Sequence, residues 1–242
     1  DLFNEGLSGI LTEQANGWYY KHNLGDGKFE RAKLVTPKPS FSGLGQQLQL
    51  ADLDADGGKQ IVNFGMEPKG YFELDDDNEW QRFKNFQYLP NIDFGDANTR
   101  MIDLNGDGLS EILITEENVF TWYKSEGRNG YSQVHKTIKS FDEEAGPHVV
   151  FADPKQTIFL ADMSGDGMTD IVRIRNGEVC YWSNLGYGKF GAKVAMDNAP
   201  VFDHPESFNP AYLKLADIDG SGTTDIIYLG KNKFTCWMNL SG

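Results

Sequence analysis

The chain has few cysteines, few histidines and no long apolar run. Its 242 residues include two cysteines, Cys180 and Cys236, which are too few for a disulfide framework and predict free thiols. No stretch of 18 or more apolar residues is present, so the sequence predicts no membrane-spanning helix. The four histidines are scattered, and neither an HExxH motif nor a serine nucleophile elbow is present. We therefore expect a protein that is not an enzyme.

Positive charge is also scarce. The chain has 22 Lys and Arg residues against 36 Asp and Glu residues, which gives a formal net charge of −14. Nucleic acids and anionic membranes are bound through basic surfaces. We therefore expect neither nucleic acid nor a membrane as a partner. Much of the acid lies in short loops, so the negative charge itself indicates metal sites.

One acidic loop lies within IDLNGDGLSEILI, residues 102–114. Counted from Asp103 as position 1, it offers side-chain oxygens at positions 1, 3, 5 and 9 and a backbone carbonyl at position 7, from Asp103, Asn105, Asp107, Glu111 and Leu109. Gly108 at position 6 allows a sharp turn. Calcium takes oxygen ligands at this spacing. Position 12 is Ile114 and the flanks are short apolar runs, so the loop predicts a strand–loop–strand calcium site and not an EF-hand.

The loop recurs along the chain. Related segments begin at residues 1, 52, 103, 162 and 217. An apolar strand precedes the last four loops, and aromatic strands follow as GWYYKHN (17–23), VFTWYKS (119–125), EVCYWSN (178–184) and KFTCWMN (233–239). The Asn176-Gly177 pair predicts a type I′ hairpin turn in the fourth unit. Four short strands per unit of roughly 50 residues are typical of a β-propeller blade.

The sequence thus predicts an all-β fold, a single β-propeller domain over residues 1–242 with four-stranded blades. Five repeat units are visible, which leaves open a ring of six or more blades. The first unit starts at its loop and lacks an inner strand, whereas the last unit lacks a fourth strand. Because the chain starts at Asp1 without a methionine, we expect a propeller excised from a larger protein.

The five loops differ as calcium ligands, and we expect three or four Ca²⁺ sites. The loops at 103, 162 and 217 have an acid at position 9, whereas the loop at 52 has Gln60, which predicts weaker binding. The loop at 1 has Phe3 and Gly9 at positions 3 and 9 and is expected to hold no ion. The other candidate ligands are Asp52, Asp54, Asp56 and Gln60 in the second loop, Asp162, Ser164, Asp166, Met168 and Asp170 in the fourth, and Asp217, Asp219, Ser221, Thr223 and Asp225 in the fifth.

Alternatives stay open for both the loops and the aromatic strands. Aspartates also cap tight turns without metal by accepting backbone N–H bonds, although several crowded carboxylates repel one another unless a cation is present. The tryptophans of the aromatic strands either stack on sugars or pack between blades. These residues are Trp18, Trp122, Trp182 and Trp237.

The loop pattern D-x-[DN]-G-D-G-x-x-[DE], followed by a short apolar strand, resembles the FG-GAP repeats of integrin-α-like propellers. The segments NIDFGDANTRMIDLNGDG (91–108) and RIRNGEVCYWSNLGYGKFGAKV (173–194) resemble the middle region of the B subunit of insecticidal Tc toxin complexes. This resemblance implies a non-enzymatic virulence module, secreted within a bacterial toxin complex. It would dock onto the pore-forming A subunit and gate the rest of the toxin shell. The alternative is a lectin or adhesion propeller that binds glycans.

Overall fold

The structure is a computed structural model that describes residues 1–242 except 4, 16, 40–47, 66, 76 and 241–242. The described residues form eighteen strands in five antiparallel sheets, with two short 3-10 helices, η1 (Gly127–Asn129) and η2 (Pro210–Tyr212). None of the helices in this part of the chain is long and apolar enough to cross a membrane. The predicted all-β fold with propeller blades is confirmed.

The chain divides into two compact units. The first comprises Asp1–Gly95 and Glu126–Ser132, and the second comprises Asp96–Ser125 and Gln133–Gly242. The expectation of a single domain over residues 1–242 stays a prediction.

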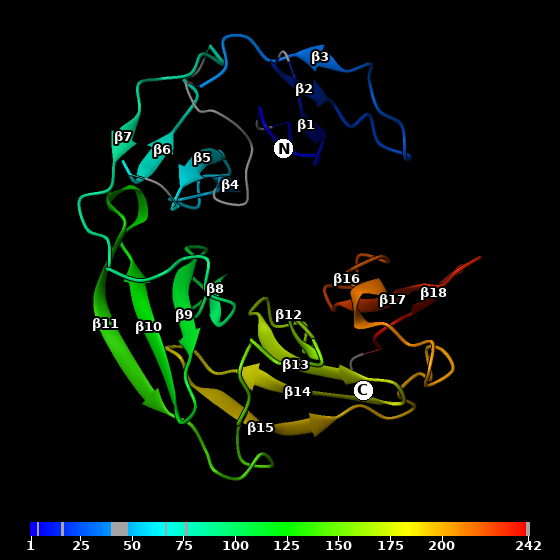
Figure 1. The fold of residues 1–242 in the computed structure, drawn as a ribbon. Coiled ribbons are helices and arrows are strands. Elements are labelled where there is room, and N and C mark those ends of the chain that lie inside the picture. Colours follow the sequence, from blue (N-terminus) through cyan, green and yellow to red (C-terminus); the bar gives the residue numbers. More distant parts are fainter. Residues whose placement is uncertain (4, 16, 40–47, 66, 76, 241–242) are drawn as a thin grey trace. The chain divides into compact units, whose positions relative to one another are not determined.

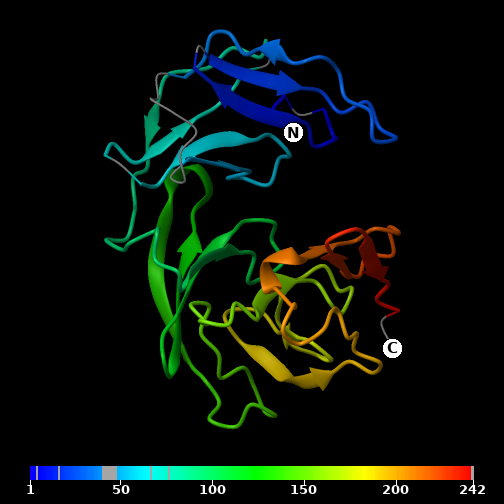
Figure 2. The same cartoon turned by 45° about the vertical axis from the view of Figure 1, so that its right-hand side comes forward.

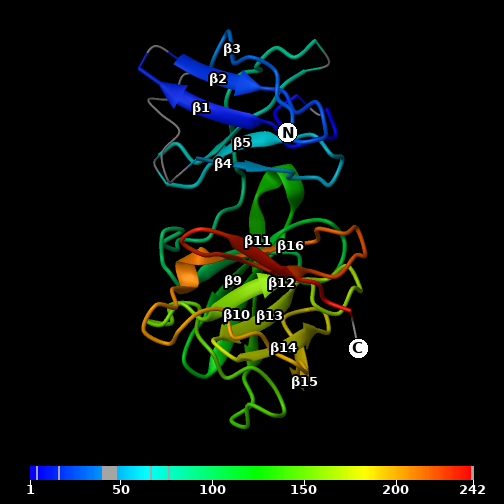
Figure 3. The ribbon, with the colours of Figure 1, turned by 90° about the vertical axis from the view of Figure 1, so that its right-hand side faces the viewer.

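The first unit contains two sheets whose strands follow one another in sequence order (Figure 1). One contains β1 (Ile10–Gln14), β2 (Gly17–Lys21) and β3 (Lys33–Leu34). The other contains β4 (Leu48–Ala51), β5 (Gln60–Asn63), β6 (Gly70–Phe72) and β7 (Lys84–Asn85). Figures 2 and 3 show β1 and β2 side by side, as their antiparallel pairing requires. The core of this unit consists of Leu2, Trp18, Tyr20, Val35 and Ile61.

The second unit contains three further sheets (Figure 1). The first of these has β8 (Thr99–Ile102), β9 (Glu111–Thr115), β10 (Val119–Ser125) and β11 (Tyr131–Ile138). The next has β12 (Ile158–Ala161), β13 (Asp170–Arg175), β14 (Glu178–Asn184) and β15 (Phe190–Ala195). The last has β16 (Leu213–Ala216), β17 (Asp225–Leu229) and β18 (Phe234–Trp237).

The end units match the sequence prediction. The sheet β1–β3 has no strand before its loop, and the sheet β16–β18 has no fourth strand among the described residues. The three sheets between them each have four strands in the predicted order. The strand pattern could be predicted because alternating and apolar runs are local properties of the sequence.

The aromatic strands lie in the core. In β14, Cys180 and Trp182 pack in one cluster with Trp122 of β10, whereas Val179 packs in another cluster with Ile226 of β17. Alternate residues of a strand point to opposite faces, so β14 contributes to the cores on both of its sides. Trp18, Trp122 and Trp182 are all buried, whereas Trp237 is half-buried. The tryptophans therefore pack between sheets. Both cysteines are free: Cys180 is buried and Cys236 is half-buried.

The hairpin between β13 and β14 differs from its prediction in one respect. Arg175 pairs with Glu178, so the turn has two residues as expected. Gly177 has a positive φ of 84°, but Asn176 is not among the residues with positive φ, so the turn is not type I′. The Asn176 side chain instead accepts the N–H of Phe202 and donates to the carbonyl oxygen of Asp203. These hydrogen bonds to residues 202 and 203 explain why Asn176 does not adopt the positive φ of a type I′ turn.

A buried lysine gives the second unit a measurable pH dependence. Lys139 is 4% exposed, and its Nζ donates to the carbonyl oxygens of Glu116 and Val149. Burial lowers its pKa to about 8 from 10.5, against a weaker opposing effect of Glu116. Between these two values the unfolded chain binds the proton and the folded chain does not, so the free energy of unfolding should rise with pH.

We expect this rise to be about 2 kcal/mol between pH 8 and 10.5. The measurement is urea unfolding of the native chain and of Lys139→Met across this range. The variant lacks the titrating group, so the difference in free energy between the two proteins isolates Lys139. Parallel pH profiles for the two proteins would contradict the prediction.

Candidate functional site

The acidic loops occupy the same place in successive sheets. They join β4 to β5, β8 to β9, β12 to β13 and β16 to β17, with the loop at residue 1 leading to β1. The candidate ligands at positions 1 to 7 therefore lie in the connection between two paired strands, and the position 9 ligand is the first residue of the second strand. Position 2 of the first four loops is a core residue, namely Leu2, Leu53, Leu104 and Met163.

The aspartate at position 1 shapes each of the loops at 103, 162 and 217, which we call the consensus loops. Its two carboxylate oxygens accept backbone N–H bonds from positions 4 and 6, at 2.7 and 2.8 Å for Asp103 with Gly106 and Gly108. These glycines have φ values of 79° and 83°, so the positive φ predicted for Gly108 is confirmed. The same two bonds join Asp162 to Gly165 and Gly167, and Asp217 to Gly220 and Gly222.

The acid at position 9 ties the loop to the sheet. Glu111, Asp170 and Asp225 are fully buried, and each accepts the backbone N–H of position 2 of its own loop. Asp170 and Asp225 also accept the N–H of the last residue of the aromatic segment, Asn184 and Asn239. The sequence pattern predicted these acids as metal ligands but not as hydrogen-bond acceptors. The N–H groups that they accept from Asn184 and Asn239 lie 14 residues away in the sequence.

The buried carboxylates favour a cation in the consensus loops. Burial, with smaller contributions from Asp107 and Asp103, raises the pKa of Glu111 to about 7, against the opposing effect of the Leu104 and Ser125 N–H groups. The Oε1 atom of Glu111 is buried. Burial also raises the pKa of Asp170. A divalent ion would offset the repulsion and the burial of charge, so the donor set of this loop fits Ca²⁺.

Among the loops at 103, 162 and 217, the fifth loop (at 217) has the most convergent carboxylates. One carboxylate oxygen each from Asp217, Asp219 and Asp225 lie within 4.8 Å of one another. Such oxygens suit Ca²⁺, which binds ligands at about 2.3–2.6 Å. The carboxylates of the loops at 103 and 162 converge less, although they have the same order of donors. If Ca²⁺ binds here, the carboxylates of Asp217, Asp219 and Asp225 would neutralise its charge and fix its position between β16 and β17.

The second loop does not fit Ca²⁺ in the same way. Asp52, Asp54 and Asp56 also converge within 4.8 Å, but cationic side chains already contact them. Arg128 Nε lies 2.9 Å from Asp54 Oδ2 and its Nη2 lies 3.4 Å from Asp56 Oδ2, while Lys59 Nζ lies 3.7 Å from Asp52 Oδ2. Gln60 uses its Oε1 to accept the N–H of Leu53. This geometry does not favour the predicted metal site.

In the first loop the hydroxyl of Tyr20 takes the role that the position 9 acid has in the consensus loops, as acceptor of the N–H of position 2. The N–H of Leu2 donates to the hydroxyl oxygen of Tyr20, which in turn donates to Glu5. A Cβ atom at Gly9 would lie 2.2 Å from this hydroxyl, so glycine leaves the space that Tyr20 fills. The loop is thus tied to its sheet by Tyr20. The expectation that it binds no ion stays a prediction.

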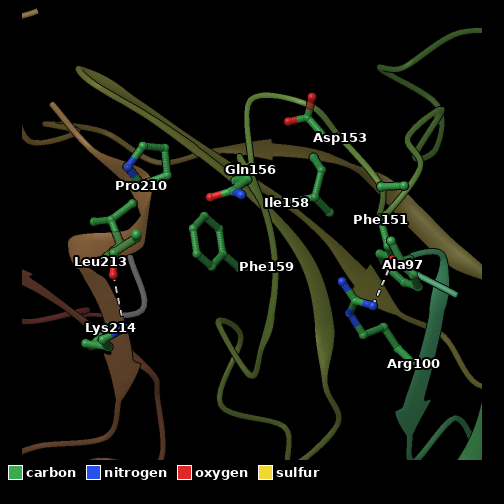
Figure 4. A pocket seen from close by; sticks show the side chains of 12 residues that line it. Ala97, Arg100, Phe151, Asp153, Gln156, Ile158, Phe159, Pro210, Leu213 and Lys214 are labelled. Atoms are coloured by element: carbon green, nitrogen blue, oxygen red, sulfur yellow. Dashed lines mark hydrogen bonds between the residues drawn. The ribbon is translucent and has the colours of Figure 1, made fainter. Parts of the chain in front are cut away.

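A separate cavity of about 490 Å³ lies in the second unit. Figure 4 shows Gln156 and Phe159 between Arg100 on one side and Lys214 on the other. Arg100 stacks over Phe151 at 5.3 Å and donates to the carbonyl oxygens of Ala97 and Thr99, and it forms no ion pair with any described acid. Sequence analysis missed this cavity because its lining is spread over residues 97–214.

Each histidine contacts neighbouring residues of the fold. His22 pairs with Glu5, His135 stacks on Trp122 at 4.2 Å, and His148 Nδ1 lies 3.0 Å from the Ser140 carbonyl oxygen. The N–H groups of Ser207 and Phe208 bond to the carbonyl oxygen of His204. These roles give no argument for catalysis, and the absence of enzymatic activity stays an expectation.

Antiparallel sheets in sequence order, each entered through the same acidic loop, define a protein of the β-propeller class. Among solved structures, the chain is similar to a chain of the Photorhabdus luminescens Tc holotoxin pore, with 30% identity and a TM-score of 0.79. That match covers 100% of this chain and 11% of the holotoxin chain. This chain therefore spans about a tenth of the protein that it matches.

Two further comparisons are weaker. A lectin from Agrocybe aegerita that recognises non-reducing terminal N-acetylglucosamine matches with 20% identity and a TM-score of 0.61, over 100% of this chain and 62% of the lectin. It supports the fold alone. A chain of the TcdB2–TccC3 structure matches with 20% identity and a TM-score of 0.47, over 98% of this chain and 14% of that one. No protein-family model and no curated protein sequence matches, so the FG-GAP assignment stays a prediction.

Proposed function

We propose that the chain is a calcium-stabilised, non-enzymatic propeller that docks proteins within a Tc-type toxin complex. The observation that carries this proposal is the similarity to the Photorhabdus luminescens Tc holotoxin chain over the whole length of this chain. This chain matches 11% of the holotoxin chain, so the proposal concerns one segment and not the activity of a whole toxin. The propeller then acts as the docking and gating module of a secreted complex.

The surface of the second unit supports a protein-binding role. Large apolar side chains there are more than 70% exposed, at Ile138, Phe141, Val201, Phe234 and Leu240. Exposed apolar residues of this size are typical of surfaces that contact other proteins when they gather into patches. The net charge of −14 favours partners with basic surfaces.

Glycan binding is the second candidate and has less support. Three of the four tryptophans that the sequence offered as a sugar platform are buried in the core. The lectin neighbour shares the fold at 20% identity and carries no further argument.

Retention of toxin partners tests the proposal. The chain is immobilised in buffer with Ca²⁺ and exposed in turn to the pore-forming A subunit and to a toxin shell that lacks its own propeller region. We expect specific retention of at least one partner, with an affinity in the micromolar range or tighter. The Agrocybe aegerita lectin is the matched control, since it has the same fold at low identity. Retention of neither partner, together with reproducible binding on a glycan array, would favour the lectin function.

A further inference from the structure

Turns with the same pair of backbone hydrogen bonds follow β2, β10 and β14. In each turn the first residue donates its N–H to the carbonyl oxygen of the residue four positions later, whose own N–H donates to the carbonyl oxygen of the second turn residue. The bonded pairs are Leu24 with Lys28 and Lys28 with Gly25, Glu126 with Gly130 and Gly130 with Gly127, and Leu185 with Lys189 and Lys189 with Gly186. The third residue of the turn is therefore Asp26, Arg128 or Tyr187.

Two of these turns lie directly against an acidic loop. A Cβ atom at Gly127 would lie 3.1 Å from the carbonyl oxygen of Leu53, in the loop at 52. In the second unit, Tyr187 donates its N–H to the carbonyl oxygen of Leu104, in the loop at 103. Both contacts are made to position 2 of the loop. The backbone of both turns therefore lies next to an acidic loop.

The two turns differ in the charge that they bring to the loop. Arg128 contacts Asp54 and Asp56, and its Nε also lies 3.6 Å from Glu73 Oε2. Arg128 lowers the pKa of Asp54, although burial raises it more strongly. Lys59 adds a second cation at Asp52. Every carboxylate of the loop at 52 therefore has a cationic partner within the first unit.

The consensus loops lack such a partner. Tyr187 is uncharged and 65% exposed, and no lysine, arginine or histidine of the described chain forms an ion pair with a carboxylate of the loops at 103, 162 or 217. Crowded carboxylates repel one another unless a cation is close. Cationic side chains therefore contact the loop at 52, whereas none among the described residues forms an ion pair with the other three loops.

We propose that the third turn residue determines the cation specificity of the adjacent loop, and that the Arg128 guanidinium occupies the place of Ca²⁺ at Asp54 and Asp56. This inference rests on the proposal that the consensus loops bind Ca²⁺, and it reduces the expected sites to three. The inference also explains why position 9 of this loop is Gln60 and not an acid. Arg128 carries a single positive charge, so a further carboxylate beside it would be poorly neutralised.

Exchange of the two turn residues tests this inference. Calcium binding is measured by titration calorimetry after chelator treatment, for the native chain, Arg128→Tyr and Tyr187→Arg. Tyr187 has a φ of 55° and Arg128 has no positive φ, so the two turns differ at this position, and each exchange replaces one non-glycine residue by another within its own turn. We expect Arg128→Tyr to bind one more ion than the native chain and Tyr187→Arg to bind one ion fewer. Arg128→Gln is a second variant, for which one additional ion is also expected.

The outcomes separate this inference from the proposed function. An unchanged number of ions in both Arg128 variants overturns the inference and leaves calcium binding by the native chain intact. If the native chain binds no ion and the Arg128 variants bind one, the displacement of Ca²⁺ by Arg128 holds, whereas calcium binding by the consensus loops and the role of Tyr187 are wrong. A native chain that binds four ions overturns the inference. If Arg128→Tyr does not fold, Arg128→Gln and Tyr187→Arg decide by the same counts.

Discussion

Saturating Ca²⁺ is expected to raise the free energy of unfolding of this chain by roughly 4–8 kcal/mol and its melting temperature by about 10–25 °C. The ions bind loops that exist only in the folded chain, so each of three sites adds about 1.4–2.7 kcal/mol at concentrations of 10–100 times its Kd. The effect should be largest at neutral pH or above, because Ca²⁺ requires the ionised carboxylate and burial raises the pKa of Glu111 to about 7.

Calorimetry and thermal unfolding of the chelator-treated chain measure this effect. The Asp103→Ala, Asp107→Ala pair should remove one ion and about a third of the stabilisation. Asp197→Ala is the matched control, since this aspartate is exposed and lies outside the loops. No binding at millimolar Ca²⁺ would mean that the carboxylates only accept the backbone N–H bonds that shape the turns.

Trp182→Ala is expected to destabilise the chain by about 3–5 kcal/mol. Trp182 is fully buried between the sheets β8–β11 and β12–β15. Its Nε1 donates to the carbonyl oxygen of Glu143 at 2.8 Å, and the Arg173 guanidinium lies 5.3 Å from its ring. The substitution removes these contacts and leaves a cavity that the rigid strands cannot fill.

Urea unfolding in calcium-free buffer measures this loss without the contribution of metal binding. Phe234→Ala is the control, because Phe234 is 72% exposed and should change the free energy of unfolding by less than about 0.5 kcal/mol. Equal effects of the two substitutions would contradict a core role for Trp182. A loss of sugar binding in Trp182→Ala without a change in stability would instead support the glycan platform.

The sequence by itself determined the strands, their order and the acidic loops. Each of these features is local: the ligands of one loop lie within nine positions, and the strands follow from alternation and apolar runs. The missing strands of the end units followed from the same repeat. The turn at Asn176 could not be predicted, because its conformation depends on bonds to residues 202 and 203.

Only the tertiary structure decided how the charge of each loop is balanced. Arg128 lies 72 positions from Asp56 in the sequence, and the hydroxyl of Tyr20 reaches Leu2 across 18 positions. Nothing in the loop pattern indicates these partners, since they reach the loops only after the sheets have formed and packed. Local spacing therefore indicates which residues could bind a cation, and packing decides which loops a cationic side chain already contacts.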